Sequence, residues 1–433
     1  MPLGLYLSVP FCRTKCSFCN FASGVFSREL HERYITHVER DIADSERLAQ
    51  AMGGRFEPSV DSIYLGGGTP SVLDADHLQR LFAAIQKNFE VMRDAEVTVE
   101  CAPGTLSTEL IDTLKSCGVT RVSLGVQSFV DQESKSVGRL HTRNIVLTEI
   151  ARLADSGISN VSVDLIAGLP YQTAESWAYS LDEVLATGVP HVSVYMLEVD
   201  EDSRLGRELI AGGTRYHAHH VPDDDLTADL YVAACGVLNA NGVRQYEISN
   251  FARGSHVIGE QHAANVGHPS LPFFASRHNL KYWLRQPYLG FGVDAHSMLP
   301  ADSGAPLAAV RFATVDDLDP LLAGAPRTRT AVDEAHAIEE AWFLGLRLNR
   351  GVELAKMAEV YGSDAVSRYR EPLMELERDG LLETVEGSIR LSDRGRLLSN
   401  TVFEKFLLNE EPGNAELRIT NAERKAGALK ILK

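Results

Sequence analysis

The chain has 433 residues, a length that predicts about two or three domains rather than a single small core. Its 42 basic and 59 acidic side chains give a formal net charge of −17, which argues against a surface that binds nucleic acid. Hydrophobic residues make up 44% of the chain, yet no run approaches the roughly 18 apolar residues that span a bilayer. With no secretion signal at the N-terminus, the sequence predicts a cytoplasmic protein without an integral membrane segment.

Three of the six cysteines lie within eight residues, directly after the short apolar run Leu3–Val9. Cys12, Cys16 and Cys19 are separated by three and then two residues. Three thiolates can hold three irons of a four-iron cluster and leave the fourth iron open for chemistry. The spacing is unusual for zinc, and no fourth ligand is near, while a disulfide would have too few residues between its thiols. The spacing alone favours an iron–sulfur cluster and leaves zinc as the alternative.

From residue 3 to about residue 200, short apolar runs alternate with longer stretches of helical spacing. Runs rich in Val, Ile, Leu or Tyr are typical of parallel strands that are buried on both faces. The expected strands are Leu3–Val9, Ser59–Leu65, Glu96–Glu100, Arg121–Gly125, Asn160–Ile166 and His191–Met196. The expected helices between them are Glu29–Leu48, Ala75–Phe89, Thr108–Cys117, Ile145–Ser156 and Thr173–Thr187.

This alternation predicts an α/β fold, a partial barrel of about six strand–helix units with its site at the carboxyl ends of the strands. A flat, doubly wound sheet gives the same linear pattern and is the alternative. Gly118, Gly157 and Gly188 follow three of the expected helices, at the position where glycine commonly ends a helix.

Polar or flexible residues follow most of the expected strands. Three glycines, Gly66, Gly67 and Gly68, come after the second strand and would let backbone amides approach a ligand. Glu100 ends the third strand, and Gln127 and Arg139 follow the fourth. Asp164 lies within the fifth. Taken singly, each is more often an ordinary loop or capping residue, but a barrel brings these positions onto one rim.

Several motifs occur together in the order that one superfamily uses. They are the stretch Tyr6–Cys12, the cysteine loop, the GGGTP loop at 66–70, the stretch Gly125–Phe129 and the tripeptide Gly168-Leu169-Pro170. Over about residues 3 to 300 the chain resembles the radical S-adenosylmethionine (SAM) superfamily. Within it, the sequence is similar to the branch that contains the oxygen-independent coproporphyrinogen III oxidase of the HemN type and the haem chaperones of the HemW type.

This resemblance implies a [4Fe–4S] cluster on Cys12, Cys16 and Cys19, with SAM bound to the open iron. Residues that match the family's contacts to SAM are Tyr6, Gly67, Glu100, Arg139, Asp164 and, less closely, Met196. Residues that match the second site beside SAM in the oxidase branch are Phe18, Gly68, Thr69 and Gln127. In the family, one electron from the cluster cleaves the sulfonium and produces a 5′-deoxyadenosyl radical.

His278 opens the segment His278-Asn279-Leu280-Lys281-Tyr282-Trp283. From the residues alone, a histidine beside an aromatic pair is more often a packing residue. The segment also matches the His-Asn-x-x-Tyr-Trp motif (HNxxYW) of HemW-type proteins, which implies that His278 is an axial ligand of haem iron. Three further histidines, His256, His262 and His268, fall in a polar segment, 254–276, where scattered histidines are more often exposed than metal ligands.

The last part of the chain has its own pattern. Expected helices at Ala337–Leu348, Leu354–Tyr361 and Ala365–Arg378, a hairpin at Gly380–Leu391 and a helix at Arg394–Leu408 resemble a winged helix. Residues 331–411 hold 17 acidic and 10 basic side chains, so the net charge of 10 − 17 = −7 disfavours DNA binding.

These patterns divide the chain into four regions. We expect a radical SAM core barrel over 1–236 and a barrel extension with the HNxxYW motif and a linker over 237–330. A winged-helix-like α+β domain of the HemN C-terminal type follows over 331–410, and a tail over 411–433.

Two departures distinguish the chain from the oxidases that it resembles. Asn20 and Phe21 follow Cys19, where the oxidases have Cys-x-Cys. Eleven residues precede Cys12, so we expect the chain to lack the N-terminal segment of the oxidases. Together with the HNxxYW motif, this favours a haem chaperone that delivers haem to respiratory membrane proteins and lacks oxidase activity. The alternatives are a radical enzyme acting on a tetrapyrrole and, less favoured, a winged-helix regulator. Whether the chain acts as a monomer or a homodimer is left open.

Overall fold

The structure is a computed structural model that describes residues 1–198, 200–254, 271–302 and 308–407. Its residues form two compact units. Of the described residues, those within Met1–His278 and Gln286–Asp333 form the first unit, and those within Asn279–Arg285 and from Glu334 to residue 407 form the second. The finer boundaries expected from the sequence stay a prediction. Residues 255–270, with His256, His262 and His268, and the expected tail from residue 411 lie outside the described residues.

The first unit is organised around one twelve-stranded sheet. Its central seven strands run parallel, in the order β9-β1-β2-β3-β4-β5-β6. These strands are β1 (Leu3–Val9), β2 (Ser59–Gly67), β3 (Glu90–Cys101), β4 (Arg121–Gln127), β5 (Asn160–Ala167), β6 (His191–Met196) and β9 (Tyr288–Phe291). All six strands expected from the sequence are confirmed, and most of their interior side chains are buried, as parallel strands require.

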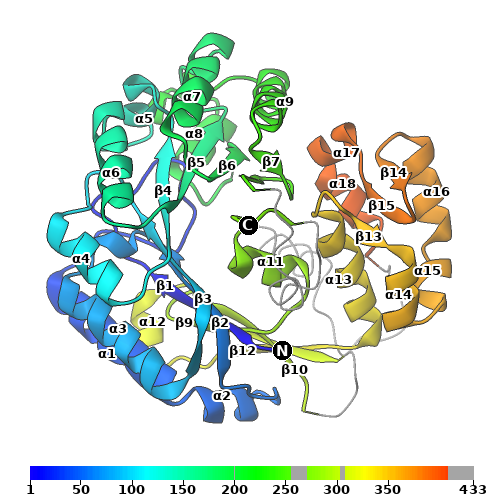
Figure 1. Ribbon diagram of the computed structural model, residues 1–433, viewed down its shortest axis with the longest axis horizontal. Coiled ribbons are helices and arrows are strands. Elements are labelled where there is room, and N and C mark those ends of the chain that lie inside the picture. The colour runs from blue at the N-terminus through cyan, green and yellow to red at the C-terminus, as the bar shows by residue number, and fades with distance from the viewer. Residues whose placement is uncertain (199, 255–270, 303–307, 408–433) are drawn as a thin grey trace. The chain divides into compact units, whose positions relative to one another are not determined.

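Helices follow the parallel strands and lie around the outside of the curved sheet (Figure 1). The longer ones are α1 (Arg28–Ala43), α3 (Ala75–Asn88), α4 (Thr108–Ser116), α6 (Arg143–Asp155), α7 (Ala174–Thr187) and α9 (Asp224–Ala240). Gly118, Gly157 and Gly188 follow three of them with φ of 80°, 93° and 71°, which confirms their predicted role as helix stops.

The strand order decides between the two expected architectures. A doubly wound sheet reverses its order near the middle, whereas β1 to β6 are neighbours in strict sequence order. The far edge of β1 pairs with β9 rather than with β6, so the parallel strands form an open, partial barrel. Antiparallel strands extend the two edges: β10 (His296–Pro300), β11 (Ala309–Ala313) and β12 (Thr328–Val332) on one side, and β8 (Asn250–Ala252) and β7 (Arg244–Gln245) on the other.

One expected helix is wrong in its extent. The predicted stretch Glu29–Leu48 is two helices, α1 and α2 (Ser45–Ala51), which meet at Asp44. Asp44 has φ −92° and ψ 5°, outside helical geometry, and its carboxylate accepts a hydrogen bond from Arg47 Nη2 at 2.6 Å.

The second unit packs helices against a three-stranded sheet, in agreement with the expected α+β pattern. Its strands are β13 (Val352–Glu353), β14 (Leu382–Val385) and β15 (Ser388–Leu391), in the order β13-β15-β14. Its helices are α13 (Glu334–Leu346), α14 (Leu354–Tyr361), α15 (Asp364–Ser367), α16 (Arg370–Arg378), α17 (Asp393–Leu397) and α18 (Ser399–Glu404). Two stretches expected as single helices, Ala365–Arg378 and Arg394–Leu408, are therefore each divided in two.

The predicted hairpin turn at Glu386-Gly387 is confirmed. Both residues have positive φ, 51° and 83°, as the two central residues of a type I′ turn do. The core of this unit surrounds Trp342, which is fully buried and donates its Nε1 hydrogen to the Ala365 carbonyl at 3.2 Å. Its ring lies 5.3 Å from that of Phe406, in a stacked arrangement.

Candidate functional site

The inner side of the barrel carries an aligned row of partly accessible residues. Tyr6 is the only accessible position in β1, and Asp164 is the only one inside β5. Glu100, at the end of β3, is also partly accessible. The strand register places Tyr6 beside Tyr64 and Gly125 beside Asp164. In β1 and β5 these positions reach solvent from strands that are otherwise largely buried, as residues that contact a ligand must.

The cysteine loop leaves β1 at this same end of the sheet. Its base is closed by two backbone hydrogen bonds, from Cys12 N to the Gly24 carbonyl and from Gly24 N to the Pro10 carbonyl, both at 2.8 Å. A tighter turn inside the loop joins Cys19 N to the Cys16 carbonyl at 3.3 Å. Cys16 is buried, whereas Cys12 and Cys19 are partly accessible.

Each of the three thiols has a polar side chain beside its sulfur. Thr69 donates its hydroxyl hydrogen to Cys12 Sγ at 3.6 Å, and Arg139 Nη1 donates to Cys16 Sγ at 3.5 Å. The Ser23 hydroxyl lies 3.7 Å from Cys19 Sγ. Hydrogen bonds to thiolate sulfurs stabilise their charge and are one of the means by which proteins tune iron–sulfur clusters.

The GGGTP loop packs directly against the strand end that leads into the cysteine loop. Gly68 N donates to the Val9 carbonyl and Thr69 N to the Phe11 carbonyl, both at 2.8 Å. A Cβ atom on Gly68 would lie 2.8 Å from Val9 O, so only glycine fits there. Gly67 has φ of 100°, a conformation that other residues rarely adopt.

The carboxyl group of Glu100 is held below the Gly66–Gly68 loop. Tyr64 donates its hydroxyl hydrogen to Glu100 Oε1 at 2.8 Å. Burial, with a further contribution from the negative charge of Asp164, raises the pKa of Glu100 to about 7. Hydrogen bonds from Tyr64 and from the Gly67 backbone act in the opposite direction but are weaker than the effect of burial.

Asp164 is surrounded by serine hydroxyls from its own strand and from the two neighbouring strands. Ser123 lies 3.0 Å from Asp164 Oδ2, and Ser162 lies 3.3 Å from Oδ1. Burial raises the pKa of Asp164, and hydrogen bonds from Ser193 and Ser123 partly offset the effect. Two acidic groups of the row thus carry an electrostatic cost that a bound cation would reduce.

Arg139 joins the fourth strand to the cysteine loop. Besides its contact to Cys16, it donates through Nη2 to the carbonyl of Gly125. A Cβ on Gly125 would lie 3.1 Å from both Arg139 Nη2 and Gln127 Nε2, so glycine leaves room for both side chains. Gln127 has a positive φ of 69°, which sets its side chain apart from the regular alternation of β4.

Comparison with known proteins agrees with this geometry. The radical SAM superfamily model matches residues 6–184, and the HemN C-terminal domain model matches residues 332–398. The haem chaperone HemW of Lactococcus lactis is 32% identical over 413 residues, which cover 94% of this chain and 98% of that protein. The HemW protein of Bacillus subtilis is 32% identical over 406 residues, covering 93% and 98% of the two chains. The chain belongs to the HemW family.

The fold of this HemW-family chain also has a solved counterpart. The coproporphyrinogen III oxidase HemN from Escherichia coli superposes with a TM-score of 0.72 and covers 94% of this chain and 90% of its own. At 23% identity, this likeness concerns the fold. It confirms the predicted fold class, a partial radical SAM barrel with a C-terminal α+β domain.

The donor set of the cysteine loop fits the [4Fe–4S] cluster that membership in the radical SAM superfamily implies. Among the described residues, no three His, Cys, Asp or Glu side chains are close enough to share a single metal ion. Cysteines around a cubane cluster lie farther apart than ligands of one ion, because each binds a different iron. The buried hydroxyl of Ser17, between Cys16 and Phe18, has no hydrogen-bond partner in the protein and is available to a bound group. This arrangement fits a cluster better than zinc.

The loop is held from the side by a segment that the sequence did not assign to the site. The residues Asp200–Leu205, which lead into α8 (Arg204–Ile210), contact the loop in four places. Arg204 Nη2 donates to the Lys15 carbonyl and, at 3.4 Å, to the Cys16 carbonyl. Leu205 N donates to the Ser17 carbonyl at 2.7 Å, and Asn20 Nδ2 donates to Asp200 Oδ2 at 2.6 Å.

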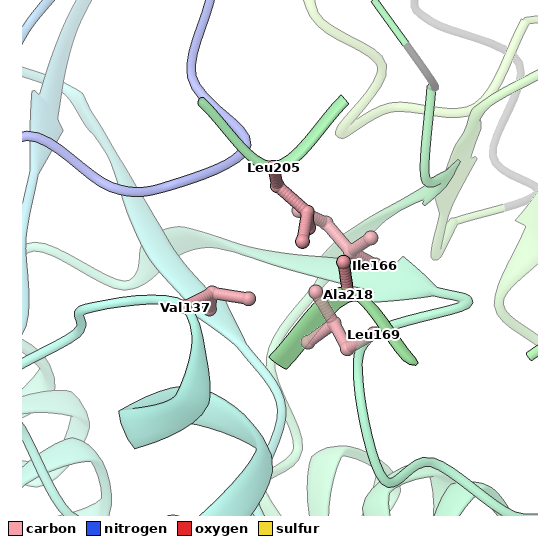
Figure 2. Close-up of a cluster of buried hydrophobic side chains, with 5 residues drawn as sticks. All are labelled: Val137, Ile166, Leu169, Leu205 and Ala218. Carbon is pink, nitrogen blue, oxygen red and sulfur yellow. The ribbon is translucent and has the colours of Figure 1, made fainter. Parts of the chain in front are cut away.

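Apolar packing supports the same contact. Val137, Ile166, Leu169, Leu205 and Ala218 form a buried cluster, drawn in Figure 2, and the partly buried Phe18 ring of the cysteine loop packs against it. The structure thus places Phe18 against the core on one side. Met196, at the end of β6, is paired in register with Ala167 and is partly accessible. Their assignments to the ligand sites stay predictions.

His278 lies in the interior of the barrel. Only 1% of its surface is exposed, its Nδ1 is 3.1 Å from Ser62 Oγ, and its ring centroid lies 5.3 Å from that of Tyr64. His278 is the second residue of α11 (Arg277–Trp283) and the first residue of the HNxxYW motif. In this conformation the imidazole is not exposed to solvent. Its assignment as a haem ligand stays a prediction.

Sequence analysis missed several polar residues of the site. Tyr64, Ser123 and Ser162 lie inside strands and contact the two acids, and Ser23 lies beside Cys19. A signal was present, because polar side chains in strands that are otherwise apolar need partners.

None of the helices in the described part of the chain has the length and apolar character of a membrane span.

Proposed function

We propose that this protein is a haem chaperone, which binds haem and transfers it to respiratory membrane proteins. The observation that carries the proposal is the 32% identity, along 94% of the chain, to a protein named as the haem chaperone HemW. The HNxxYW segment at His278–Trp283 supports it. Partners would be haem and its acceptor proteins, and the site of action would be the cytoplasm.

Cys12, Cys16 and Cys19 would hold the [4Fe–4S] cluster. Thr69, Arg139 and Ser23 would then act on the ligand sulfurs as they do on the thiols, at 3.6, 3.5 and 3.7 Å. The cluster supplies an open iron and a single electron when it is bound. The contacts from Arg204 and Leu205 would keep the loop in a conformation that accepts it.

SAM would lie beside the cluster, along the row of accessible residues. Glu100 and Asp164 supply carboxyl groups for its positive charge and its hydroxyls, and the Gly66–Gly68 backbone leaves room for its close approach. Tyr6, Arg139 and Met196 complete the proposed set. Gly68, Thr69, Gln127 and Phe18 would border the neighbouring second site.

The proposed chaperone lacks coproporphyrinogen oxidase activity. Phe21 stands where the oxidases of this branch carry a fourth cysteine, and half of its surface is exposed. Asn20, the residue between, is bound to Asp200 at 2.6 Å. A radical enzyme acting on a tetrapyrrole is the competing function, because the predicted cluster and SAM site would equip the chain for it.

A haem titration tests the proposal. Reconstituted protein and its His278→Ala variant are titrated anaerobically with haemin, and the Soret band is followed. We expect saturable, stoichiometric binding by the wild type, and a changed Soret band in the variant if His278 binds the iron. If neither protein binds haemin saturably, the chaperone proposal is wrong.

A further inference from the structure

A chain of contacts runs below the two acids of the row and ends at the start of α11. We propose that His278 is a positioning residue for Glu100: its imidazole fixes the ring of Tyr64, and Tyr64 orients the carboxyl group that meets SAM. The inference rests on the proposed SAM site. It gives the first residue of the HNxxYW motif a role that does not involve iron.

The rings of His278 and Tyr64 are in contact. The two rings are 5.3 Å apart and inclined by 31°, and the Tyr6 ring lies 6.3 Å from His278 and 6.2 Å from Tyr64. His278 is itself held in place, because Ser62 Oγ lies 3.1 Å from its Nδ1. The rings of Tyr6 and His278 thus restrict the orientation of the Tyr64 ring, and the Ser62 hydroxyl holds His278 in place.

A hydrogen bond joins Tyr64 to Glu100. The Tyr64 hydroxyl donates to Oε1 of Glu100 across 2.8 Å. A shift of the Tyr64 ring would break the bond and leave Glu100 without it at a site where burial already raises its pKa. Truncation of His278 to alanine would open space beside the ring and permit that shift.

The backbone of the motif is anchored to the same strand. The amide nitrogens of Arg277 and His278 both donate to the Glu96 carboxylate at 3.1 Å, as a helix start does to an acidic cap. Glu96 and Glu100 are four residues apart in β3, so they share one face of the strand. The start of α11 is therefore linked to Glu100 by a second route, through hydrogen bonds to Glu96 and then along the backbone of β3.

Asp164 is joined to the same place. Ser162 lies 3.3 Å from Asp164 Oδ1 and 2.8 Å from His191 Nδ1. His191 Nε2 lies 3.0 Å from the Tyr246 hydroxyl, which accepts from the Ser276 amide at 3.1 Å. Both acids of the row thus connect through buried polar groups to Ser276–His278. Buried polar groups are costly unless they are paired, so these pairings fix their neighbours firmly.

A double-mutant cycle tests the proposal in the full-length, cluster-reconstituted protein. SAM affinity is read from the change that SAM causes in the EPR spectrum of the reduced cluster, for the wild type, His278→Ala, Tyr64→Phe and the double variant. We expect each single substitution to weaken SAM binding by roughly fivefold to tenfold, and the double variant to be no weaker than about one single variant. Equal affinities of His278→Ala and wild type, or additive losses, would overturn the proposal.

Two further variants separate positioning from loss of structure and from iron ligation. His77→Ala removes a buried histidine that contacts Glu32, outside the row of acids, and should leave SAM affinity unchanged. His278→Phe keeps a flat ring against Tyr64 but cannot bind iron, so we expect SAM affinity within about threefold of the wild type. If His278→Phe loses as much SAM affinity as His278→Ala, ring packing is not the positioning contact.

The proposal and the proposed function fail in different ways. Wild-type protein that does not respond to SAM would remove the SAM site itself. Wild-type protein that binds SAM, with a His278→Ala variant that loses haem and keeps full SAM affinity, would contradict the positioning role and leave the chaperone function standing.

Discussion

Tyr64 donates its hydroxyl hydrogen to Glu100 across 2.8 Å, and yet burial keeps the pKa of that carboxyl near 7. The two residues come from adjacent strands, β2 and β3, at the partly accessible row inside the barrel. The pair therefore carries a cost in the free protein that a positively charged ligand would reduce. A site that is unfavourable until it is occupied is typical of a binding site rather than of a packing contact.

Replacement of Glu100 by Gln should stabilise the ligand-free protein at neutral pH. A folded pKa of about 7, against 4.5 for the ordinary group, means that the folded state binds the proton more tightly, so stability falls as pH rises from 4.5 to 7. We expect E100Q to unfold with a free energy about 3 kcal/mol higher than the wild type at pH 8 and equal to it at pH 4. Urea unfolding at the two pH values measures this.

The same variant should lose SAM. Gln cannot supply a negative charge, so we expect the SAM affinity of reconstituted E100Q to fall at least about tenfold at pH 8. A variant that binds SAM as the wild type does would show that Glu100 lies outside the ligand site.

Removal of the Arg204 side chain should loosen the cysteine loop. Arg204 donates to the carbonyls of Lys15 and Cys16, and loss of such hydrogen bonds from a charged group costs about 1 to 3 kcal/mol. We expect R204A to lose cluster iron to a chelator several-fold faster than the wild type. Arg204 and Arg215 both lie over the Tyr216 ring, at 5.5 and 5.6 Å. Arg215 is exposed, so R215A is the control and should release iron at the wild-type rate.

The apolar cluster of Figure 2 should contribute to stability through Leu205. Only 2% of this side chain is exposed, so L205A should lower the free energy of unfolding by about 2 to 4 kcal/mol. Ile210, in the same helix, is 63% exposed, and I210A should change it by less than about 0.5 kcal/mol. Similar effects of both substitutions would contradict the packing seen here.

Thr69 should set the electronic properties of the cluster through Cys12. Replacing Thr69 by Val keeps the shape of the side chain and removes the donor to Cys12 Sγ, so the more negative, reduced cluster loses stabilisation. We expect a lower reduction potential in an EPR-monitored titration. T148V, which changes an exposed threonine of α6, is the control. If T69V and the wild type have the same reduction potential, Thr69 does not donate to Cys12 in the cluster-bound protein.

Local patterns were enough to predict the barrel. Each strand from β1 to β6 carries its own apolar signal, and Gly118, Gly157 and Gly188 mark helix ends without any knowledge of distant contacts. The acids at Glu100 and Asp164 could be expected on one rim because parallel strands end on the same side. These features depend on neighbours in the sequence.

Other features depend on residues that are distant in the sequence. Asn20 meets Asp200, Arg204 meets Lys15, and His278 meets Ser62, 216 residues away. The break at Asp44 is a change of backbone conformation, to φ −92° and ψ 5°, that the helical spacing over Glu29–Leu48 does not reveal. From the residues alone, His278 is expected to be a packing residue, but its contact with Ser62 cannot be predicted from the sequence.

One measurement tests the central claim, that a radical SAM fold here serves haem handling. Reconstituted protein, reduced under anaerobic conditions with excess SAM, is incubated with haem and coproporphyrinogen III, and the Soret band and the tetrapyrrole products are followed together. We expect saturable haem binding and unchanged coproporphyrinogen. Formation of a decarboxylated porphyrinogen, or the absence of saturable haem binding, would contradict it.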